Sequence, residues 1–298
     1  MTDHATLMRR AAIASLSVAL FLIVLKFAAY LATDSVAMLA SLADSGLDFF
    51  ASIINLVAVR SSLTPPDREH RFGHGKAEPL AGLAQGAFIA GSATFLIIEA
   101  ASRLAQPHVV GHEVVGLAVM GISIFATVVL IAYQHMVVSR TDSLAISADR
   151  MHYTSDLLTN VGVVASLLLV TQLGWTLADP VMGILIAVFL AWSAWSVFRQ
   201  SYDQLMDREL PDEDRARIKS LVMGHAEVRN LHDLRTRASG LNTFIQFHIE
   251  LDPAISLMRA HEISDAVEAE ICAAFPHAEI LIHQDPAGME PQPALAQV

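Results

Sequence analysis

The sequence predicts a membrane protein with an all-α domain of six transmembrane helices, followed by a C-terminal cytoplasmic α+β domain of ferredoxin-like type. Three observations lead to this fold class. The 298 residues are 54% hydrophobic and only 16% charged, which is less charge than a soluble protein of this size carries. Apolar runs of about twenty residues, each long enough to cross a bilayer, recur in the first two thirds of the chain. From about Asp207 the sequence becomes charged and has no further run of that length.

Six apolar runs give the predicted spans and together define a transmembrane domain over residues 1–206. The chain starts with a short polar segment, and the run that follows is too long for the core of a signal peptide, so we expect it to be retained as the first span. The spans are expected near residues 11–31, 36–59, 80–104, 114–137, 144–173 and 180–198.

Basic residues in the loops predict how the spans are oriented. Arginine and lysine are frequent before the first span, between the second and third, and at later span ends on the same side, whereas the opposite loops offer only Arg103. By the positive-inside rule, both termini lie in the cytoplasm of a multi-pass protein of the cell's inner membrane. The basic residues used are Arg9, Arg10, Arg60, Arg68, Arg71, Lys76, Arg140 and Arg199.

Two pairs of polar residues interrupt these apolar runs. Asp44 and Asp48 are four residues apart in the second run, and His152 and Asp156 have the same spacing in the fifth. This spacing puts each pair on one face of its helix. A carboxylate in the membrane interior is costly unless something compensates its charge. Three carboxylates and one imidazole form a ligand set for a divalent metal ion, tetrahedral if the ion is zinc.

The two pairs are expected at the same depth in the bilayer. The second span enters from outside and the fifth from the cytoplasm, so Asp44 and His152 each lie about 13 Å from the start of their helices at 1.5 Å per residue. In a hydrocarbon core about 30 Å thick, both pairs are near the middle. The alternative is that each polar residue pairs privately with a Ser, Asn or Lys. Lys26 is one such partner, unless it extends to the outer interface. Asp149 and Asn160 lie near the pairs, and a supporting, proton-relay or ordinary polar role stays open for them.

The loop after the second span contains another candidate metal site. In the segment TPPDREHRFGHGKAEPL, Asp67, His70 and His74 are spaced as metal ligands. Gly73 and Gly75 would let the backbone wrap around an ion. The alternative is a solvated basic loop that happens to contain two histidines.

Residues 207–290 are expected to form the cytoplasmic domain. The tripeptide Leu210-Pro211-Asp212 has the proline and acids of a helix start. Strands are expected at 228–237, 242–251 and 278–283, with an amphipathic helix at 256–275. The order helix, strand, strand, helix, strand indicates a ferredoxin-like domain. Residues 291–298 are expected to be a disordered tail.

The cytoplasmic domain is rich in histidine, and several of these residues can reach one edge of the expected sheet. A binuclear metal site is predicted from His232, His248, His261, His283 and Asp285. The alternative for any one of these histidines is a solvated surface position. The single Cys272 excludes an internal disulfide and is expected to be a buried thiol. The net charge of -11 argues against a nucleic-acid partner.

Seven segments carry a resemblance to a known family: LADSGLD, DREHRFGHGKAEPLA, HYTSD, LMDREL, HDLRTR, FIQFHIEL and LIHQDP. With these segments, the chain resembles the cation diffusion facilitator family and its bacterial zinc and ferrous-iron efflux members, from Arg10 to about Pro286. The resemblance implies a transport site at Asp44, Asp48, His152 and Asp156, and a loop site at Asp67, His70 and His74. It also implies a cytoplasmic binuclear site at His232, His248, His261, His283 and Asp285, in which Asp285 bridges.

The resemblance further implies a homodimer held through the cytoplasmic domains, with an interdomain ion pair between Lys76 and Asp207. We therefore expect an efflux transporter for a divalent cation, zinc first and ferrous iron or cadmium as alternatives. Because metal ligands must be deprotonated, protons and metal compete for one site. This competition favours proton antiport with alternating access, and His152 is the natural proton carrier.

Two other functional classes are less consistent with these residues. A catalytic zinc site keeps one position open for water, whereas four protein ligands are available here and no HExxH segment occurs. The protein is therefore not expected to be an enzyme. A metal sensor anchored in the membrane would leave the carboxylates in the middle of the bilayer unexplained.

Overall fold

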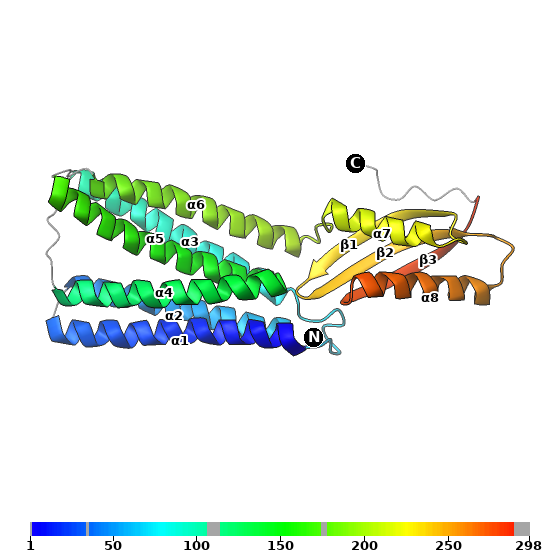
Figure 1. Ribbon diagram of the computed structural model, residues 1–298, viewed down its shortest axis with the longest axis horizontal. Coiled ribbons are helices and arrows are strands. Elements are labelled where there is room, and N and C mark those ends of the chain that lie inside the picture. The colour runs from blue at the N-terminus through cyan, green and yellow to red at the C-terminus, as the bar shows by residue number, and fades with distance from the viewer. Residues whose placement is uncertain (1, 34–35, 106–113, 174–177, 289–298) are drawn as a thin grey trace. The chain divides into compact units, whose positions relative to one another are not determined.

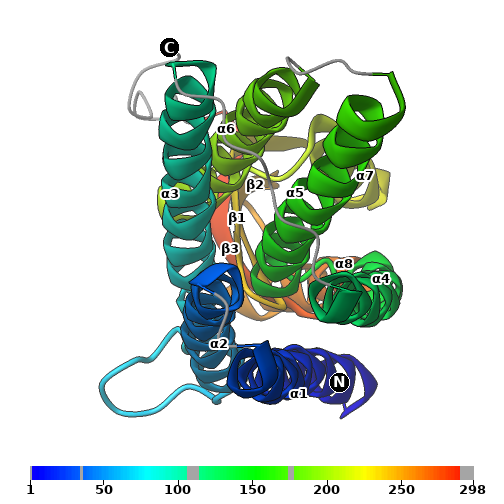
Figure 2. The same cartoon turned by 90° about the vertical axis from the view of Figure 1, so that its left-hand side faces the viewer.

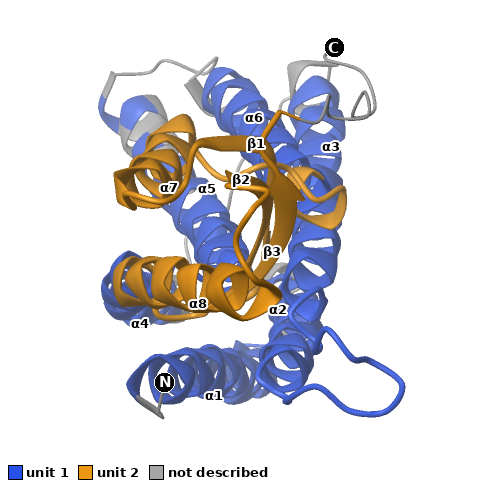
Figure 3. Ribbon diagram, turned by 90° about the vertical axis from the view of Figure 1, so that its right-hand side faces the viewer, with its two compact units in different colours: residues 1–202 blue, residues 203–298 orange. Residues whose placement is uncertain are grey.

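The chain divides into two compact units, residues 1–202 and 203–298, each of which has its own core (Figures 1 and 3). The computed structural model describes residues 2–33, 36–105, 114–173 and 178–288. The predicted tail at 291–298 lies outside the described residues.

The first unit is built of long helices, and the predicted helical membrane domain is confirmed. The helices are α1 (Thr2–Thr33), α2 (Val36–Ser62), α3 (Ala77–Ala105), α4 (Val114–Thr141), α5 (Leu144–Leu173) and α6 (Ala178–Leu205). Among the described residues, all but α5 contain a stretch long and apolar enough to cross a membrane. Helix α5 carries Asp149, Arg150 and Asp156 within its first half, and these charges lower its hydropathy.

Within this unit, α5 contacts most of the other helices, so residues on its first turns can meet several chain segments. Helix α1 packs against α2 and α4, and α5 packs against α2, α3 and α4 (Figure 2). Helix α6 joins through an apolar cluster shared with α3 and α5. At Gly82 an added Cβ would lie 2.2 Å from Ser201 Oγ, so the helices approach closely there. Large apolar side chains that face outward, as expected toward lipid, include Leu31, Phe95, Ile98, Phe125 and Val188.

The second unit has the predicted element order. It consists of α7 (Asp212–Gly224), β1 (Asn230–Ser239), β2 (Asn242–Leu251), α8 (Leu257–Ala274) and β3 (Ala278–Pro286). The sheet order is β1-β2-β3, with β1 and β2 antiparallel and β2 and β3 parallel. The parallel pair needs a crossover, which α8 provides, and Ser256 caps its first turn by accepting from Arg259 N at 3.2 Å.

Alternation along β2 decides which face of the sheet carries the polar residues. Ile245, Phe247 and Ile249 are buried against α7 and α8, which cover one face of the sheet (Figure 3). The intervening His248 therefore points to the other face. The predicted buried Cys272 is instead half-buried. It follows Ile271, which is fully buried, and one residue along a helix turns the side chain about 100° away from the core face.

Candidate metal centres

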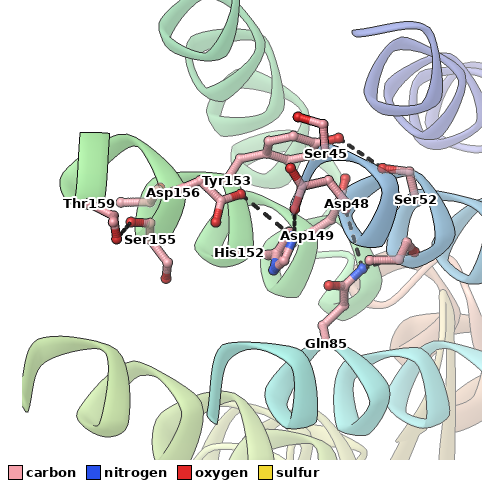
Figure 4. A network of polar contacts seen from close by, with 12 residues as sticks. Ser45, Asp48, Ser52, Gln85, Asp149, His152, Tyr153, Ser155, Asp156 and Thr159 are labelled. Atoms are coloured by element: carbon pink, nitrogen blue, oxygen red, sulfur yellow. Dashed lines mark hydrogen bonds and ion pairs between the residues drawn. The ribbon is translucent and has the colours of Figure 1, made fainter. Parts of the chain in front are cut away.

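The first cluster of potential ligands lies inside the helical unit, where α2 and α5 are in contact. Asp48 on α2 approaches His152 on α5, with 3.2 Å between Oδ1 and Nε2. Asp156, one turn further along α5, has its Oδ2 3.7 Å from the same nitrogen. One ligand atom from each of the three residues lies within 4.8 Å of the others. The three side chains turn toward one another in Figure 4, and their spacing suits a single small cation.

Asp44, the fourth predicted ligand, occupies a different position. It lies one turn before Asp48 on α2, is exposed on the surface of the single chain, and is not part of the compact cluster. The structure therefore brings together three of the four predicted side chains, and the four-ligand set stays a prediction. Asp156 Oδ2 is buried without a hydrogen-bond partner among the described residues, as expected of an atom that would face an ion.

Lys26, considered as a private partner of a carboxylate, makes different contacts. Its Nζ donates to Ser45 Oγ at 2.6 Å and to the carbonyl of Ser41 at 3.2 Å, both on α2. The side chain is only 7% exposed, so it is buried in the helical unit rather than extended to an interface.

A polar network lies directly beside the cluster on the side of the first turns of α5. Asp149 is fully buried and accepts hydrogen bonds from Ser15 Oγ at 2.6 Å, Gln134 Nε2 at 2.7 Å and Gln85 Nε2 at 3.4 Å. The hydroxyl of Tyr153 lies 2.8 Å from Ser52 Oγ (Figure 4). The sequence left the role of Asp149 open and did not single out its partners. Their only signal is that each is a polar residue within an apolar run.

The loop between α2 and α3 holds a second cluster: Asp67, His70 and His74. The Asp67 carboxylate accepts the backbone N–H groups of Glu69 at 2.9 Å and His70 at 2.7 Å. The hydrogen bond from His70, with that from Glu69 and the nearby imidazoles, holds the pKa of Asp67 below its ordinary value. Asp67 Oδ2 lies 3.4 Å from His74 Nε2, and Oδ1 lies 3.6 Å from His70 Nδ1. Gly73 has a φ of 78°, so the tight turn here depends on a glycine.

A third cluster lies on the open face of the sheet in the second unit. His232, His248 and His283 stand side by side on the three strands, as the pairings His232 with His248 and His248 with His283 require. The carboxylate of Asp285 contacts all three histidines. Its Oδ2 lies 2.8 Å from His248 Nδ1 and 3.3 Å from His232 Nε2, and its Oδ1 lies 3.3 Å from His283 Nε2. A carboxylate with both oxygens engaged in this way can bridge two ions.

The structure does not bring the fifth predicted residue, His261, into this cluster. It lies on α8 with Nε2 3.6 Å from Asp265, and its side chain is 66% exposed. Two acids that the sequence did not indicate lie near the histidines: Asp233 Oδ2 is 3.9 Å from His248 Nε2, and Glu250 Oε1 is 4.0 Å from His232 Nε2. The position of Glu250 could have been predicted from the sequence, because it is two residues from His248 and thus on the same face of β2.

The predicted ion pair between Lys76 and Asp207 would join the two units and stays a prediction. Within the second unit, Asp207 lies 3.3 Å from Arg237 Nη1.

Comparison with known proteins gives matches over both units. The family model described as the cation efflux transmembrane domain matches residues 12–206, and that of the cation efflux protein cytoplasmic domain matches residues 210–287. A relative named cation-efflux pump FieF from Shewanella oneidensis is 45% identical over 278 residues, or 93% of this chain and 94% of the relative. The protein of the same name from Serratia proteamaculans is 42% identical over 290 residues, or 97% of this chain and 96% of the relative.

Two similar solved structures each cover less than a third of this chain. A CzrB chain in its zinc form is 30% identical, covers 29% of this chain and 99% of its own length, and has a TM-score of 0.27. A nickel form of a MamM CTD variant is 26% identical, covers 26% of this chain and 98% of its own length, and has a TM-score of 0.25.

Proposed function

Because the chain belongs to the cation diffusion facilitator (cation efflux) family, we propose that it exports a divalent metal cation across the inner membrane in exchange for protons. The relatives are named as pumps, so we also propose that it is a transporter and not an enzyme.

The observation that carries this proposal is the convergence of Asp48, His152 and Asp156 inside the helical unit. Three titratable side chains in the membrane interior are costly without a compensating charge, and such groups commonly mark an ion pathway. Two of them come from α5 and one from α2. A cation held there would therefore bridge two helices, and a relative movement of these helices would change the site's affinity or its access. Asp44, one turn away on α2, is the proposed fourth ligand.

The chemistry of these ligands supplies the coupling. Carboxylates and imidazole bind metal only when deprotonated, so an arriving ion displaces protons and an arriving proton displaces the ion. His152 is the proposed proton carrier because imidazole titrates near neutral pH. With both termini in the cytoplasm, the site would open alternately to the cytoplasm, where metal enters, and to the outside, where protons enter.

The types of ligand in the helical cluster limit the transported ion to a class of divalent metals. Carboxylate and imidazole suit zinc, and they also accept ferrous iron and cadmium, because affinity alone does not separate these ions. We propose zinc as the first substrate, with ferrous iron and cadmium as alternatives.

The proposed assembly is a homodimer through the cytoplasmic unit, whose family match is the cation efflux cytoplasmic domain. Two further metal sites are proposed: one at Asp67, His70 and His74, and a binuclear centre bridged by Asp285 and completed by His261. Metal bound at these sites is proposed to link the arrangement of the dimer to the concentration of metal in the cytoplasm.

Flux through proteoliposomes tests the function. Zinc uptake and internal pH are followed with two dyes under an imposed pH gradient, for the wild type and for Asp48→Ala. We expect gradient-dependent zinc flux in the wild type and its loss in the variant. Asp212→Ala, a change at a side chain that is 99% exposed, is the control and should transport normally. Wild-type protein that carries no divalent cation, or a variant that carries it equally well, would refute the proposal.

A further inference from the structure

Asp149 is a buried titratable group that the proposed metal site does not use. It lies on α5, three residues before His152 and five after Leu144, the first residue of the helix. At 1.5 Å per residue these intervals are about 4.5 Å and about 7.5 Å along the helix axis. Asp149 thus lies between the metal cluster and the end of α5 that is proposed to face the cytoplasm.

The surroundings of Asp149 accommodate an ionised carboxylate with neutral donors. The groups that donate to it are Ser15 on α1, Gln134 on α4 and Gln85 on α3. The titratable groups nearby are His152 and Tyr153 on its own helix and, beyond them, Asp48 on α2 (Figure 4). A buried carboxylate held only by neutral donors is costly as a permanent charge.

The same surroundings also accommodate the protonated form. Gln85 Oε1 and Gln134 Oε1 are buried and have no hydrogen-bond partner among the described residues. An amide carries both a donor and an acceptor, so a flip of either glutamine's amide group would present its oxygen as an acceptor to the O–H of a protonated Asp149. Donors for the anion and unused acceptors for the acid are therefore both present beside Asp149.

Ser15 lies between Asp149 and a neighbour of the metal ligands, and it contacts both. Ser15 Oγ donates to Asp149 at 2.6 Å, and the Tyr153 hydroxyl donates to the Ser15 carbonyl at 3.2 Å. Tyr153 follows His152 in the sequence, and the centroids of the two rings are 5.7 Å apart. Asp149 and His152 are therefore neighbours within one buried polar network.

We propose that Asp149 is a proton-binding residue through which the proton displaced by incoming metal leaves for the cytoplasm, an inference that rests on the proposed antiport. In this step a protonated ligand of the metal cluster loses H⁺ as the metal bond forms, and the Asp149 carboxylate takes it up as a carboxylic acid. Asp149 then releases the same proton to water at the cytoplasmic end of α5. No electrons are exchanged, and one proton leaves for each proton displaced.

The test compares wild type with Asp149→Asn in full-length protein. Asparagine keeps an oxygen to accept from Ser15 and Gln134 and adds a donor for the unused amide oxygens, so the helices should remain packed. We expect an unchanged zinc Kd at high pH, a zinc flux reduced roughly a hundredfold, the low end for a positioned proton-transfer group, and a flux that no longer varies with cytoplasmic pH. The matched control is Asp142→Asn, an exposed residue with a φ of 50° that asparagine tolerates.

Two results would overturn the inference. The first is that Asp149→Asn transports zinc at the wild-type rate and with the wild-type dependence on pH, in an assay in which the wild type exchanges zinc for protons. A wild type whose zinc flux ignores the pH gradient would instead contradict the proposed function itself. If Asp149→Asn does not assemble, infrared difference spectra on zinc addition replace it: a protonated-carboxyl band is expected in the wild type and should shift in Asp149→Glu. The absence of that shift is the second overturning result.

Discussion

Replacing Asp48 with alanine should nearly abolish metal binding in the helical unit. Asp48 is the only member of the compact cluster that comes from α2, and its Oδ1 lies 3.2 Å from His152 Nε2. Zinc binding to a four-ligand protein site is worth about 10–16 kcal/mol, so one ligand accounts for about 3–4 kcal/mol. At about 1.4 kcal/mol per factor of ten, the expected loss is about two to three orders of magnitude in Kd.

The measurement must isolate this site from the other two clusters. We would titrate zinc against a fluorescent chelator in a background carrying Asp67→Ala and Asp285→Ala, each of which removes the carboxylate at the centre of another cluster. Adding Asp48→Ala to this background should weaken the remaining site, and adding Asp212→Ala should not. A Kd that does not change with Asp48→Ala would refute the reasoning, because the ion would then be held elsewhere.

Three further outcomes are expected. His152→Asp replaces the only nitrogen donor with oxygen, so the ratio of zinc to cadmium flux in vesicles should change; an equal ratio would contradict the role of the imidazole. Asp285→Ala removes the carboxylate that contacts three histidines, so calorimetry should find fewer zinc ions bound per chain, and an unchanged number would contradict the bridge. Arg259 donates to Glu227 and holds its pKa below the ordinary 4.5, so this pair's stabilisation is present above pH 4.5 and is lost as the pH falls through the lowered value. Chemical denaturation of wild type and Glu227→Gln should therefore differ above pH 4.5 and converge below it; a difference that grows with acidity would contradict the sign.

Much of the fold could be predicted because its signals are periodic. The span predicted at 144–173 matches the bounds of α5, and the alternating segment 242–251 matches those of β2. The spacing of four residues between His152 and Asp156 predicted their shared helix face. Equal depths of this pair and of Asp48 in the bilayer predicted that α2 and α5 would bring them together, as the structure does.

What could not be predicted depends on contacts between helices that leave no pattern in the sequence. Ser15, Gln85 and Gln134 each look like an isolated polar residue in an apolar run, and only the packing of α1, α3 and α4 on α5 brings them to Asp149. Within a single chain the position of α8 leaves His261 beside Asp265, so its place in the cytoplasmic centre stays a prediction.

The location of the bound metal tests the central claim most directly. Zinc anomalous scattering from crystals of the full-length protein should show a peak between Asp48, His152 and Asp156. Protein that transports zinc in vesicles but shows no peak among these three side chains in any crystallised state would contradict the account.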